Sequence, residues 1–309
     1  MARPIIIDCD PGVDDAIALL LACAHPNDLN ILGITTVAGN VPLPYTSQNA
    51  LKICTLAQAD IPVYAGCPRP MLRPLSTAAD IHGATGLQGT ELPTPRHSLM
   101  VQHAVAFLID TLQQATEPIT LATLGPLTNI ALALIQAPQI APKIDAIIAM
   151  GGAITHGNIT PAAEFNIYVD PHAAQVVFSA GIPIKLITLD TTHQVLTTAE
   201  HLAALRQLHT PVGTAAADLL AHYGTADVER YGMAGAPLHD PCVIAYLLEP
   251  ELFTFKPTYT SVDIHSPENL GRTVVDWWGK TGKPSNVDVA ATVNAPDLYA
   301  LLIESLARL

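Results

Sequence analysis

Four aspartates lie close together near the start of the chain. They are Asp8, Asp10, Asp14 and Asp15, and they follow a short apolar run. Carboxylates this close repel one another, and burying them without partners is costly. Hard divalent cations such as Ca²⁺ and Mg²⁺ bind carboxylate and carbonyl oxygens, so a bound cation would replace this repulsion with coordination. The cluster therefore predicts a site for a divalent cation.

The same aspartates also have a purely structural interpretation. Asp14 and Asp15 fall in the first turn of an expected helix, where the helix dipole favours acidic side chains. Asp10 precedes a proline and could act as a simple cap. These roles account for two or three of the carboxylates one at a time, but not for their gathering at one strand end. We therefore favour the metal interpretation.

Two familiar phosphate and metal motifs are excluded. An EF-hand loop beginning at Asp8 would need an acidic residue at its fifth position and glutamate at its twelfth, where this chain has Gly12 and Leu19. A phosphate-binding loop would need a Gly-Lys-Ser/Thr run, which the sequence lacks.

The composition narrows the class of protein further. The chain has 309 residues, with 27 acidic and 14 basic side chains and a formal net charge of -13. An acidic chain without a basic run is a poor candidate for binding nucleic acid. No apolar stretch is long enough to cross a membrane or to form a signal peptide. The five scattered cysteines suggest no disulfide framework, so we expect a reduced, cytoplasmic protein.

Strand and helix patterns alternate along most of the chain and must position the aspartates. We expect mostly parallel strands at 5–9, 31–37, 63–65, 119–123, 144–150, 184–189 and 287–293, with antiparallel strands near 259–264 and 272–276. We expect helices at 13–23, 46–59, 101–115, 129–136, 171–180 and 241–248, another from 295, and one after a capping-box signal at 197–200. Residues 66–98 and 151–168 are expected to be loops.

This alternation predicts an α/β fold. We expect an open, mostly parallel, doubly wound sheet with helices on both faces and a small antiparallel addition, formed by one domain over residues 1–309. Ligands of such sheets bind at the carboxyl ends of the strands, and the acidic cluster follows the first strand.

Several motifs in the same order resemble those of the nucleoside hydrolases. The motifs are Asp8-Cys9-Asp10-Pro11-Gly12-Val13-Asp14-Asp15, Val37-Ala38-Gly39-Asn40, His82-Gly83, Leu124-Gly125-Pro126-Leu127-Thr128-Asn129, Met150-Gly151-Gly152, Pro161-Ala162-Ala163-Glu164-Phe165-Asn166 and Pro237-Leu238-His239-Asp240-Pro241. The likeness runs nearly end to end. It implies an open α/β sheet and hydrolysis of the N-glycosidic bond of ribonucleosides with a bound Ca²⁺.

The resemblance also implies roles for single residues. Asp10, Asp15 and Asp240 would give carboxylate oxygens to the cation, together with the main-chain carbonyl of Leu124, and Asp10 would be the general base. His239 and His82 would help the base to leave. The residues that the resemblance places around the substrate are Asp14, Asn40, His82, Met150, Asn158, Glu164, Phe165, Asn166, Tyr231 and His239.

Many of these residues have ordinary structural alternatives. Asn40 and Asn158 follow glycines and could form turns, and Asp240 could cap a helix. A histidine such as His82 in an irregular loop is usually solvated, and Met150 is of a type more often found in a plain core. Ile81 and Asp227 fall near the expected position of the base, although a surface acid is the simpler interpretation of Asp227.

Three other functions remain open on the sequence alone. A ribosyl- or deoxyribosyltransferase would cleave the same N-glycosidic bond, with a carboxylate as the nucleophile. A metal-dependent phosphohydrolase would use Asp8 and Asp10, but no suitable Ser/Thr and Lys follow. A calcium-dependent nucleoside-binding protein would lack turnover. The motifs look closer to those of pyrimidine-preferring members, with uridine and cytidine as substrates, and the family suggests a homodimer or homotetramer.

Overall fold

The computed structural model describes residues 2–231 and 235–309, and for residues 224–231 it describes the backbone alone. Its main sheet contains the strands β1 (Arg3–Cys9), β2 (Leu29–Thr36), β3 (Val63–Ala65), β4 (Ile119–Thr123), β5 (Ile144–Met150), β6 (Ile184–Ile187), β9 (Phe253–Val262), β10 (Thr273–Asp276) and β11 (Val287–Val293). These nine strands are ordered β10-β9-β11-β6-β5-β4-β1-β2-β3. The pairs from β3 to β11 are parallel, and β9 runs antiparallel to both of its neighbours.

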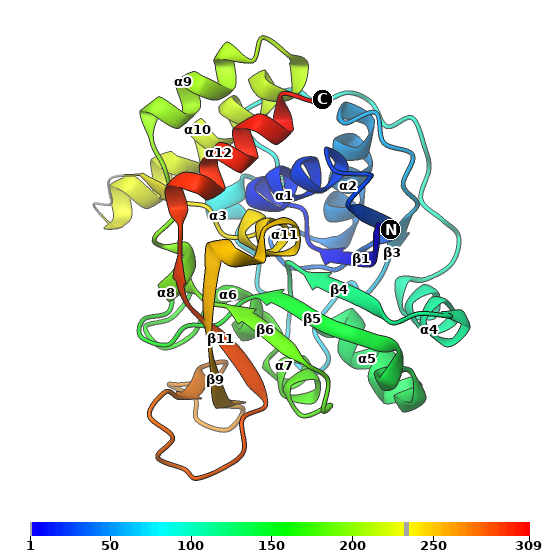
Figure 1. Ribbon diagram of the computed structural model, residues 1–309, viewed down its shortest axis with the longest axis vertical. Coiled ribbons are helices and arrows are strands. Elements are labelled where there is room, and N and C mark those ends of the chain that lie inside the picture. Colours follow the sequence, from blue (N-terminus) through cyan, green and yellow to red (C-terminus); the bar gives the residue numbers. More distant parts are fainter. Residues whose placement is uncertain (1, 232–234) are drawn as a thin grey trace.

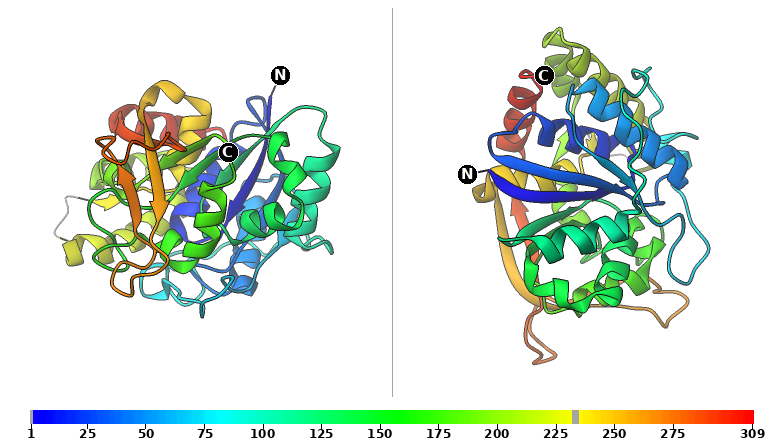
Figure 2. Two further views of the ribbon diagram at one scale, coloured as in Figure 1. Left: turned by 90° about the horizontal axis from the view of Figure 1, so that it is seen from below. Right: turned by 90° about the vertical axis from the view of Figure 1, so that its right-hand side faces the viewer.

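Helices cover both faces of this sheet (Figures 1 and 2). The longer ones are α1 (Val13–Cys23), α2 (Leu43–Leu56), α4 (Ala104–Gln114), α5 (Thr128–Gln136), α7 (Pro171–Phe178), α9 (Ala199–Gln207), α10 (Pro211–Tyr231), α11 (Pro241–Leu248) and α12 (Ala295–Leu306). Short helices are α3 (Ala79–His82), α6 (Phe165–Val169) and α8 (Leu189–Thr192), and β7 (Leu196–Thr197) pairs with β8 (Ala236–Pro237). The expected fold class is thus confirmed.

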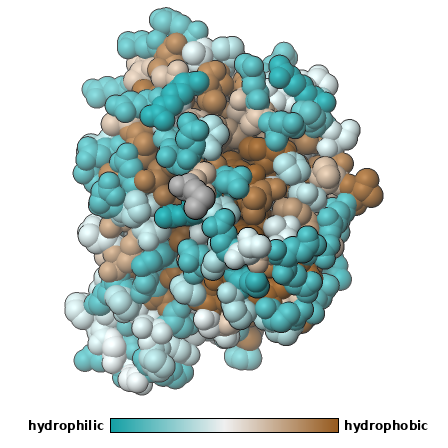
Figure 3. Space-filling view, turned by 45° about the vertical axis from the view of Figure 1, so that its right-hand side comes forward, coloured by the Kyte–Doolittle hydropathy of each residue, from teal (hydrophilic) through white to brown (hydrophobic). Residues whose placement is uncertain are grey.

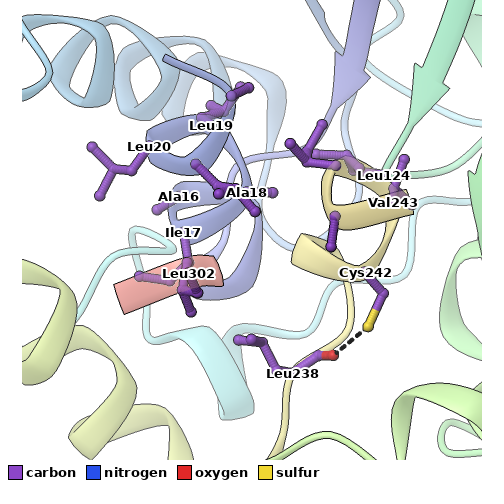
Figure 4. Close-up of a cluster of buried hydrophobic side chains, with 14 of the residues drawn as sticks. Ala16, Ile17, Ala18, Leu19, Leu20, Leu124, Leu238, Cys242, Val243 and Leu302 are labelled. Carbon is purple, nitrogen blue, oxygen red and sulfur yellow. Dashed lines mark hydrogen bonds between the residues drawn. The ribbon is translucent and has the colours of Figure 1, made fainter. Parts of the chain in front are cut away.

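Two apolar cores lie on the two faces of the sheet. One core joins α1, α2, α10, α11 and α12 to alternate residues of the strands, and Figure 4 shows the part where α1, α11 and α12 meet. The other core joins α4, α5 and α7 to the opposite face. Ile5 and Ile7 of β1 point to the first core and Ile6 points to the second, because successive strand residues face opposite ways. This double burial explains the continuous apolar runs of the parallel strands.

The space-filling view in Figure 3 shows a mostly hydrophilic surface with apolar side chains gathered over part of one face. Within the residues that the structure covers, no helix combines the length and the apolar character that crossing a membrane would require.

One strand begins earlier than the sequence pattern indicates. We expect a strand from residue 259, but β9 begins at Phe253 and includes Pro257. Proline lacks the N–H that an interior strand needs. Only Tyr259–Val262 pair with β10, so Pro257 has a strand on one side alone, where the missing donor is tolerated.

Two predicted helix starts are also corrected. The cap of α9 is Thr198, whose side chain accepts a hydrogen bond from the N–H of His201, rather than Thr197 with Glu200. His201 Nδ1 lies 3.2 Å from the N–H of Thr198 and takes the place of the expected glutamate. The helix expected at 101–115 begins at Ala104. In addition, neither α8 nor most of α10 is predicted by the sequence pattern.

Candidate active site

The strand order places a crevice in the middle of the sheet. β1 and β4 are neighbours, and the chain moves outward from β1 through β2 to β3 and from β4 through β5 to β6. In doubly wound sheets, ligands bind where the strand order reverses in this way, outside the carboxyl ends. Asp10 follows β1 and Leu124 follows β4, so both lie at that point. The arrowheads of β4 and β5 point toward the side where α3, α6 and α8 lie (Figure 1).

A cavity of about 220 Å³ lies there. Its lining comes from eight regions that are far apart in the sequence. The lining residues are Asp14, Asn40, Ala78, Asp80, Ile81, His82, Leu124, Met150, His156, Gly157, Asn158, Ile159, Glu164, Phe165, Asn166, His193, Tyr223, Pro237, His239 and Asp240. Nine of the ten predicted substrate-binding residues are in this lining, among them His82 and His239, which are also the predicted catalytic histidines.

The lining includes two members of a tight group of buried carboxylates. Oxygens of Asp14, Asp15 and Asp240 all lie within 4.8 Å of one another. Asp14 and Asp15 occupy the first turn of α1, and Asp240 precedes α11. Burial and the charge of Asp15 raise the pKa of Asp14 to about 8, and burial together with the neighbouring aspartates raises the pKa of Asp240 well above its usual value.

Asp15 also organises the loop that precedes α1. Its carboxylate accepts hydrogen bonds from the N–H of Gly12 at 3.0 Å, the N–H of Asp10 at 3.1 Å and the side chain of Asn40 at 3.1 Å. The first of these caps the helix, because the N–H groups of the first turn have no partner within the helix. Asp15 therefore holds the backbone of Asp10 in place.

The carboxylate of Asp10 is enclosed between two glycines. A Cβ on Gly39 would lie 2.0 Å from Asp10 Oδ2, and a Cβ on Gly125 would lie 2.2 Å from Asp10 Oδ1. Oδ2 accepts a hydrogen bond from the N–H of Asn40 at 2.7 Å, while the buried Oδ1 has no partner among the described residues. Burial and the charge of Asp15 raise the pKa of Asp10 well above its usual value.

These residues fit a hard divalent cation. The available donors are carboxylate oxygens and the carbonyl of Leu124, all buried, which is the oxygen-rich set that such ions prefer. The unpartnered Oδ1 of Asp10 and the raised pKa values are what removal of a neutralising ion from such a cluster would produce. The tight group contains the predicted ligands Asp15 and Asp240, but its third member is Asp14 rather than Asp10.

The polar residues predicted to bind ribose have roles within the fold as well. Glu164 caps α6, and its carboxylate accepts hydrogen bonds from three backbone N–H groups, of Asn166, Gly152 and Ile167. Burial nevertheless raises the pKa of Glu164 to about 7. The side chain of Asn166 donates to the carbonyl of Leu124 at 2.7 Å. Asn166 thus connects α6 to the carbonyl predicted to bind the cation.

Asn40 and Asn158 hold the two loops that border the cavity. Asn40 Nδ2 donates to the carbonyl of Asp10 at 3.2 Å, and Asn158 Oδ1 accepts from the N–H of Phe165 at 2.9 Å. Met150 and Phe165 are buried and also line the cavity, so they serve as both core and wall.

Both predicted histidines are buried at the cavity. His82 is the last residue of α3 and is only 5 % exposed, so the expectation of a solvated histidine in an irregular loop is wrong. Its Nδ1 accepts a hydrogen bond from the N–H of Val13 at 3.1 Å. His239 Nδ1 lies 2.7 Å from Thr192 Oγ1. Burial lowers the pKa of each histidine to about 3, so both are neutral near pH 7.

Four polar residues of the lining are not predicted from the sequence, namely Asp80, His156, His193 and Tyr223. Tyr223 stacks obliquely on His82, with ring centroids 5.2 Å apart. Its position eight residues before Tyr231 on the same helix could have indicated it, because residues four apart share a helix face. The side chains of Asp227 and Tyr231 lie outside the described residues, so their predicted contacts with the base stay predictions.

Neither Asp8 nor Asp10 lines the cavity, and Asp8 is also turned away from Asp10. Asp8 points to the other face of the sheet, where its Oδ1 accepts hydrogen bonds from Thr35 at 2.5 Å and Asn129 at 2.8 Å. Burial raises its pKa to about 7. This separation argues against the phosphohydrolase alternative, which needs Asp8 and Asp10 to act on one ligand.

Comparisons with known proteins agree with this site. The sequence model of the inosine-uridine preferring nucleoside hydrolase family matches residues 5–300. The pyrimidine-specific ribonucleoside hydrolase RihA of Photobacterium profundum is 48% identical over 310 residues, covering 100% of both chains. A purine-preferring ribonucleoside hydrolase from Gardnerella vaginalis superposes with a TM-score of 0.92 at 33% identity, covering 99% of this chain and 98% of that one.

A plant nucleoside hydrolase, PpNRh1, superposes equally well, with a TM-score of 0.92 at 34% identity over 99% of each chain. The family match covers nearly the whole chain, and the cavity lining includes Asp14 of the acidic motif and the two histidines that first indicated the resemblance. The chain therefore belongs to the inosine-uridine preferring nucleoside hydrolase family and is a ribonucleoside hydrolase.

Proposed function

We propose that this enzyme prefers pyrimidine ribonucleosides and hydrolyses uridine and cytidine to ribose and the free base with the help of Ca²⁺. The observation that carries the proposal is the group of buried carboxylates at one wall of the cavity, with two neutral histidines elsewhere in its lining. The pyrimidine preference rests on the relatives named pyrimidine-specific, which are 46–48% identical, against 33% for the purine-preferring neighbour.

We assign the cation to Asp10, Asp15, Asp240 and the carbonyl of Leu124, with Asp14 close enough to contribute. When bound, Ca²⁺ would neutralise these carboxylates, hold vicinal hydroxyls of the ribose and lower the pKa of a neighbouring water. The donor set contains only oxygen atoms, which suits Ca²⁺ better than a softer transition metal.

We assign the other catalytic and binding roles to side chains of the protein. Asp10 accepts a proton from the attacking water, through the Oδ1 atom that has no partner among the described residues. The surrounding carboxylates stabilise the positive charge that develops on the ribose as the glycosidic bond breaks. Asn40, Asn158, Glu164 and Asn166 orient the sugar hydroxyls. His82 and His239 interact with the departing base.

The test is hydrolysis of uridine, cytidine, inosine and adenosine by chelator-treated protein, assayed with and without added Ca²⁺. We expect turnover of uridine and cytidine that requires the added ion. Faster turnover of inosine than of uridine would refute the pyrimidine preference, and full activity after exhaustive chelation would refute the role of the cation.

The same assay separates the remaining alternatives. A ribosyltransferase would exchange a labelled free base into the nucleoside, whereas a hydrolase releases ribose to water. A binding protein would retain uridine without releasing uracil. That the chain forms a single domain stays a prediction. That it assembles as a homodimer or homotetramer also stays a prediction, which analytical ultracentrifugation can test.

A further inference from the structure

His239 has a partner on α8 that no predicted role includes. Thr192 is the last residue of α8, is fully buried, and lies with Oγ1 2.7 Å from His239 Nδ1. The imidazole lines the cavity, and its other nitrogen, Nε2, has no hydrogen bond to any residue whose side chain the structure describes. Among the described side chains, Thr192 thus contacts Nδ1 of His239, and Nε2 is the nitrogen that we consider for the ligand.

The distances indicate the direction of this hydrogen bond. A threonine hydroxyl has one hydrogen to donate. The other acceptor near Thr192 Oγ1 is the carbonyl of Leu189, at 3.5 Å, which is longer than a normal O–H···O bond. The contact with His239 Nδ1 is the shorter of the two, so we infer that Thr192 donates its hydrogen there. When Nδ1 of a neutral imidazole accepts a hydrogen bond, the proton of the ring must be on Nε2.

His82 shows the same arrangement by an independent contact. Its Nδ1 accepts from the backbone N–H of Val13, a group that can only donate. A neutral His82 therefore also carries its proton on Nε2. The fold supplies a donor to Nδ1 of both cavity histidines, from α1 in one case and from α8 in the other.

We propose that Thr192 is a positioning residue that donates to His239 Nδ1 and so directs the Nε2–H group of His239 at the departing base. The proposal rests on the proposed function and deepens it. In this proposal, the hydrogen bond from the buried Thr192 hydroxyl determines which imidazole nitrogen of His239 contacts the substrate.

The proton balance of the reaction is consistent with this role. The bond between C1′ and the base nitrogen breaks, and the base leaves with the electron pair. The water oxygen bonds to C1′, one water proton passes to Asp10 and then to solvent, and the base takes up one proton from solvent. His239 keeps its proton and offsets the charge of the base through the Nε2–H hydrogen bond.

Two substitutions at Thr192 and one at its neighbour test the proposal. Thr192→Val removes the hydroxyl but keeps the shape, and Thr192→Ser restores the hydroxyl. Thr191→Val is the matched control, because Thr191 is equally buried on α8 and donates to the carbonyl of Ala290 at 3.0 Å instead. Each variant is assayed with uridine and with 4-nitrophenyl riboside, whose leaving group departs as a stable anion without a hydrogen bond.

We expect Thr192→Val to lower kcat for uridine at least about tenfold, and Thr192→Ser and Thr191→Val to stay near wild type. With 4-nitrophenyl riboside, all three variants should be close to wild type. Equal losses of Thr192→Val on both substrates, or wild-type turnover of uridine, would overturn the proposal. If the wild-type enzyme cleaves the nitrophenyl riboside but neither uridine nor cytidine, the proposed function fails instead.

A second measurement tests the tautomer without turnover. Long-range ¹⁵N–¹H spectra of ¹⁵N-histidine-labelled protein distinguish the two neutral forms, and His239→Gln identifies the signal. We expect the Nε2–H form of His239 in the wild type and in Thr191→Val, and its loss or mixing in Thr192→Val. An Nδ1–H form in the wild type would overturn the proposal whatever the assays show.

Discussion

Asp10 and Asp8 each bury a carboxylate oxygen that has no partner among the described residues. Such atoms are rare in folded proteins, and each indicates either strain or a missing ligand. The two differ in their surroundings, because the charges of Asp15 and Asp14 act on Asp10 while Asp8 is held by Thr35 and Asn129. A ligand is therefore expected at Asp10, whereas Asp8 connects β1 to β2 and to α5.

Replacing Asp10 by asparagine distinguishes the role of Asp10 in catalysis from its effect on stability. Asp10→Asn keeps an oxygen that can accept from the N–H of Asn40, but it removes the base, so kcat for uridine should fall about 1,000-fold. Thermal unfolding of the chelated variant should occur at or above the wild-type temperature, because one repelling charge has gone. The surface variant Asp60→Asn, at a side chain 92% exposed, is the control and should change neither measurement. Wild-type turnover in Asp10→Asn would remove Asp10 from the reaction.

At the scale of elements, the turns after the strands decide where the carboxylates lie. Gly125 follows β4 and approaches Asp10 so closely that no side chain fits between them. The same holds for Gly39 after β2. The site therefore depends on backbone that packs directly against a charged side chain.

We expect Gly125→Ala to displace Asp10 and to abolish most turnover, because the new Cβ would lie 2.2 Å from Oδ1. Gly151→Ala is the matched control after β5, where the nearest atom is the flexible end of Ile167 at 3.2 Å. Uridine assays and Ca²⁺ titration by calorimetry measure both effects. If the Gly125 variant bound Ca²⁺ and turned over uridine like the wild type, the close packing would have no functional importance.

The cap of α9 gives a second prediction at this scale. Thr198→Ala should lower the free energy of unfolding by about 1 kcal/mol, because the N–H of His201 loses its acceptor. Glu200→Ala should change it by less than about 0.5 kcal/mol, since His201 occupies the position of the capping-box partner. Urea unfolding of the two variants decides between Thr198 and Thr197 as the start of the helix, and the reverse order of effects would favour Thr197.

At the scale of the whole molecule, the buried acids make stability depend on pH and on the cation. Burial raises the pKa of Asp8 to about 7, of Asp14 to about 8 and of Glu164 to about 7. In the unfolded chain these groups are already ionised above pH 5. The folded protein without metal thus binds more protons than the unfolded chain between pH 6.5 and 8, so its stability falls as pH rises through this range.

We expect chelated protein to lose on the order of 2 kcal/mol of unfolding free energy between pH 6.5 and pH 8. His82 and His239 offset only part of this loss, about 0.4 kcal/mol each, because both are neutral in the folded state while unfolded histidine is half protonated at pH 6.5 and neutral at pH 8. Added Ca²⁺ should restore more stability at pH 8 than at pH 6.5, since binding requires ionised carboxylates. Denaturant unfolding at both pH values, with and without Ca²⁺, measures this. A pH-independent stability of the chelated protein would contradict the prediction.

The sequence by itself determined the fold class and the position of the acidic motif. The apolar runs of the strands, the Asp-Pro starts of α7 and α11 and the glycines near Asp10 are local signals, and their meaning depends only on backbone geometry and burial. The ordered series of motifs also indicated the family. These features were predictable because each is encoded in a few neighbouring residues.

Only the tertiary structure decided which side chains meet. It buries His82, turns Asp8 away from Asp10, brings Asp14 to Asp240 and places Thr192 against His239. Some of these contacts join residues that are more than forty positions apart in the sequence, so they depend on strand order and helix packing. The orientation of Asp8 depends on which face of the sheet its position in β1 faces. Short stretches of sequence do not encode that information, because the energy of such contacts arises only after the sheet and its two helical layers have assembled.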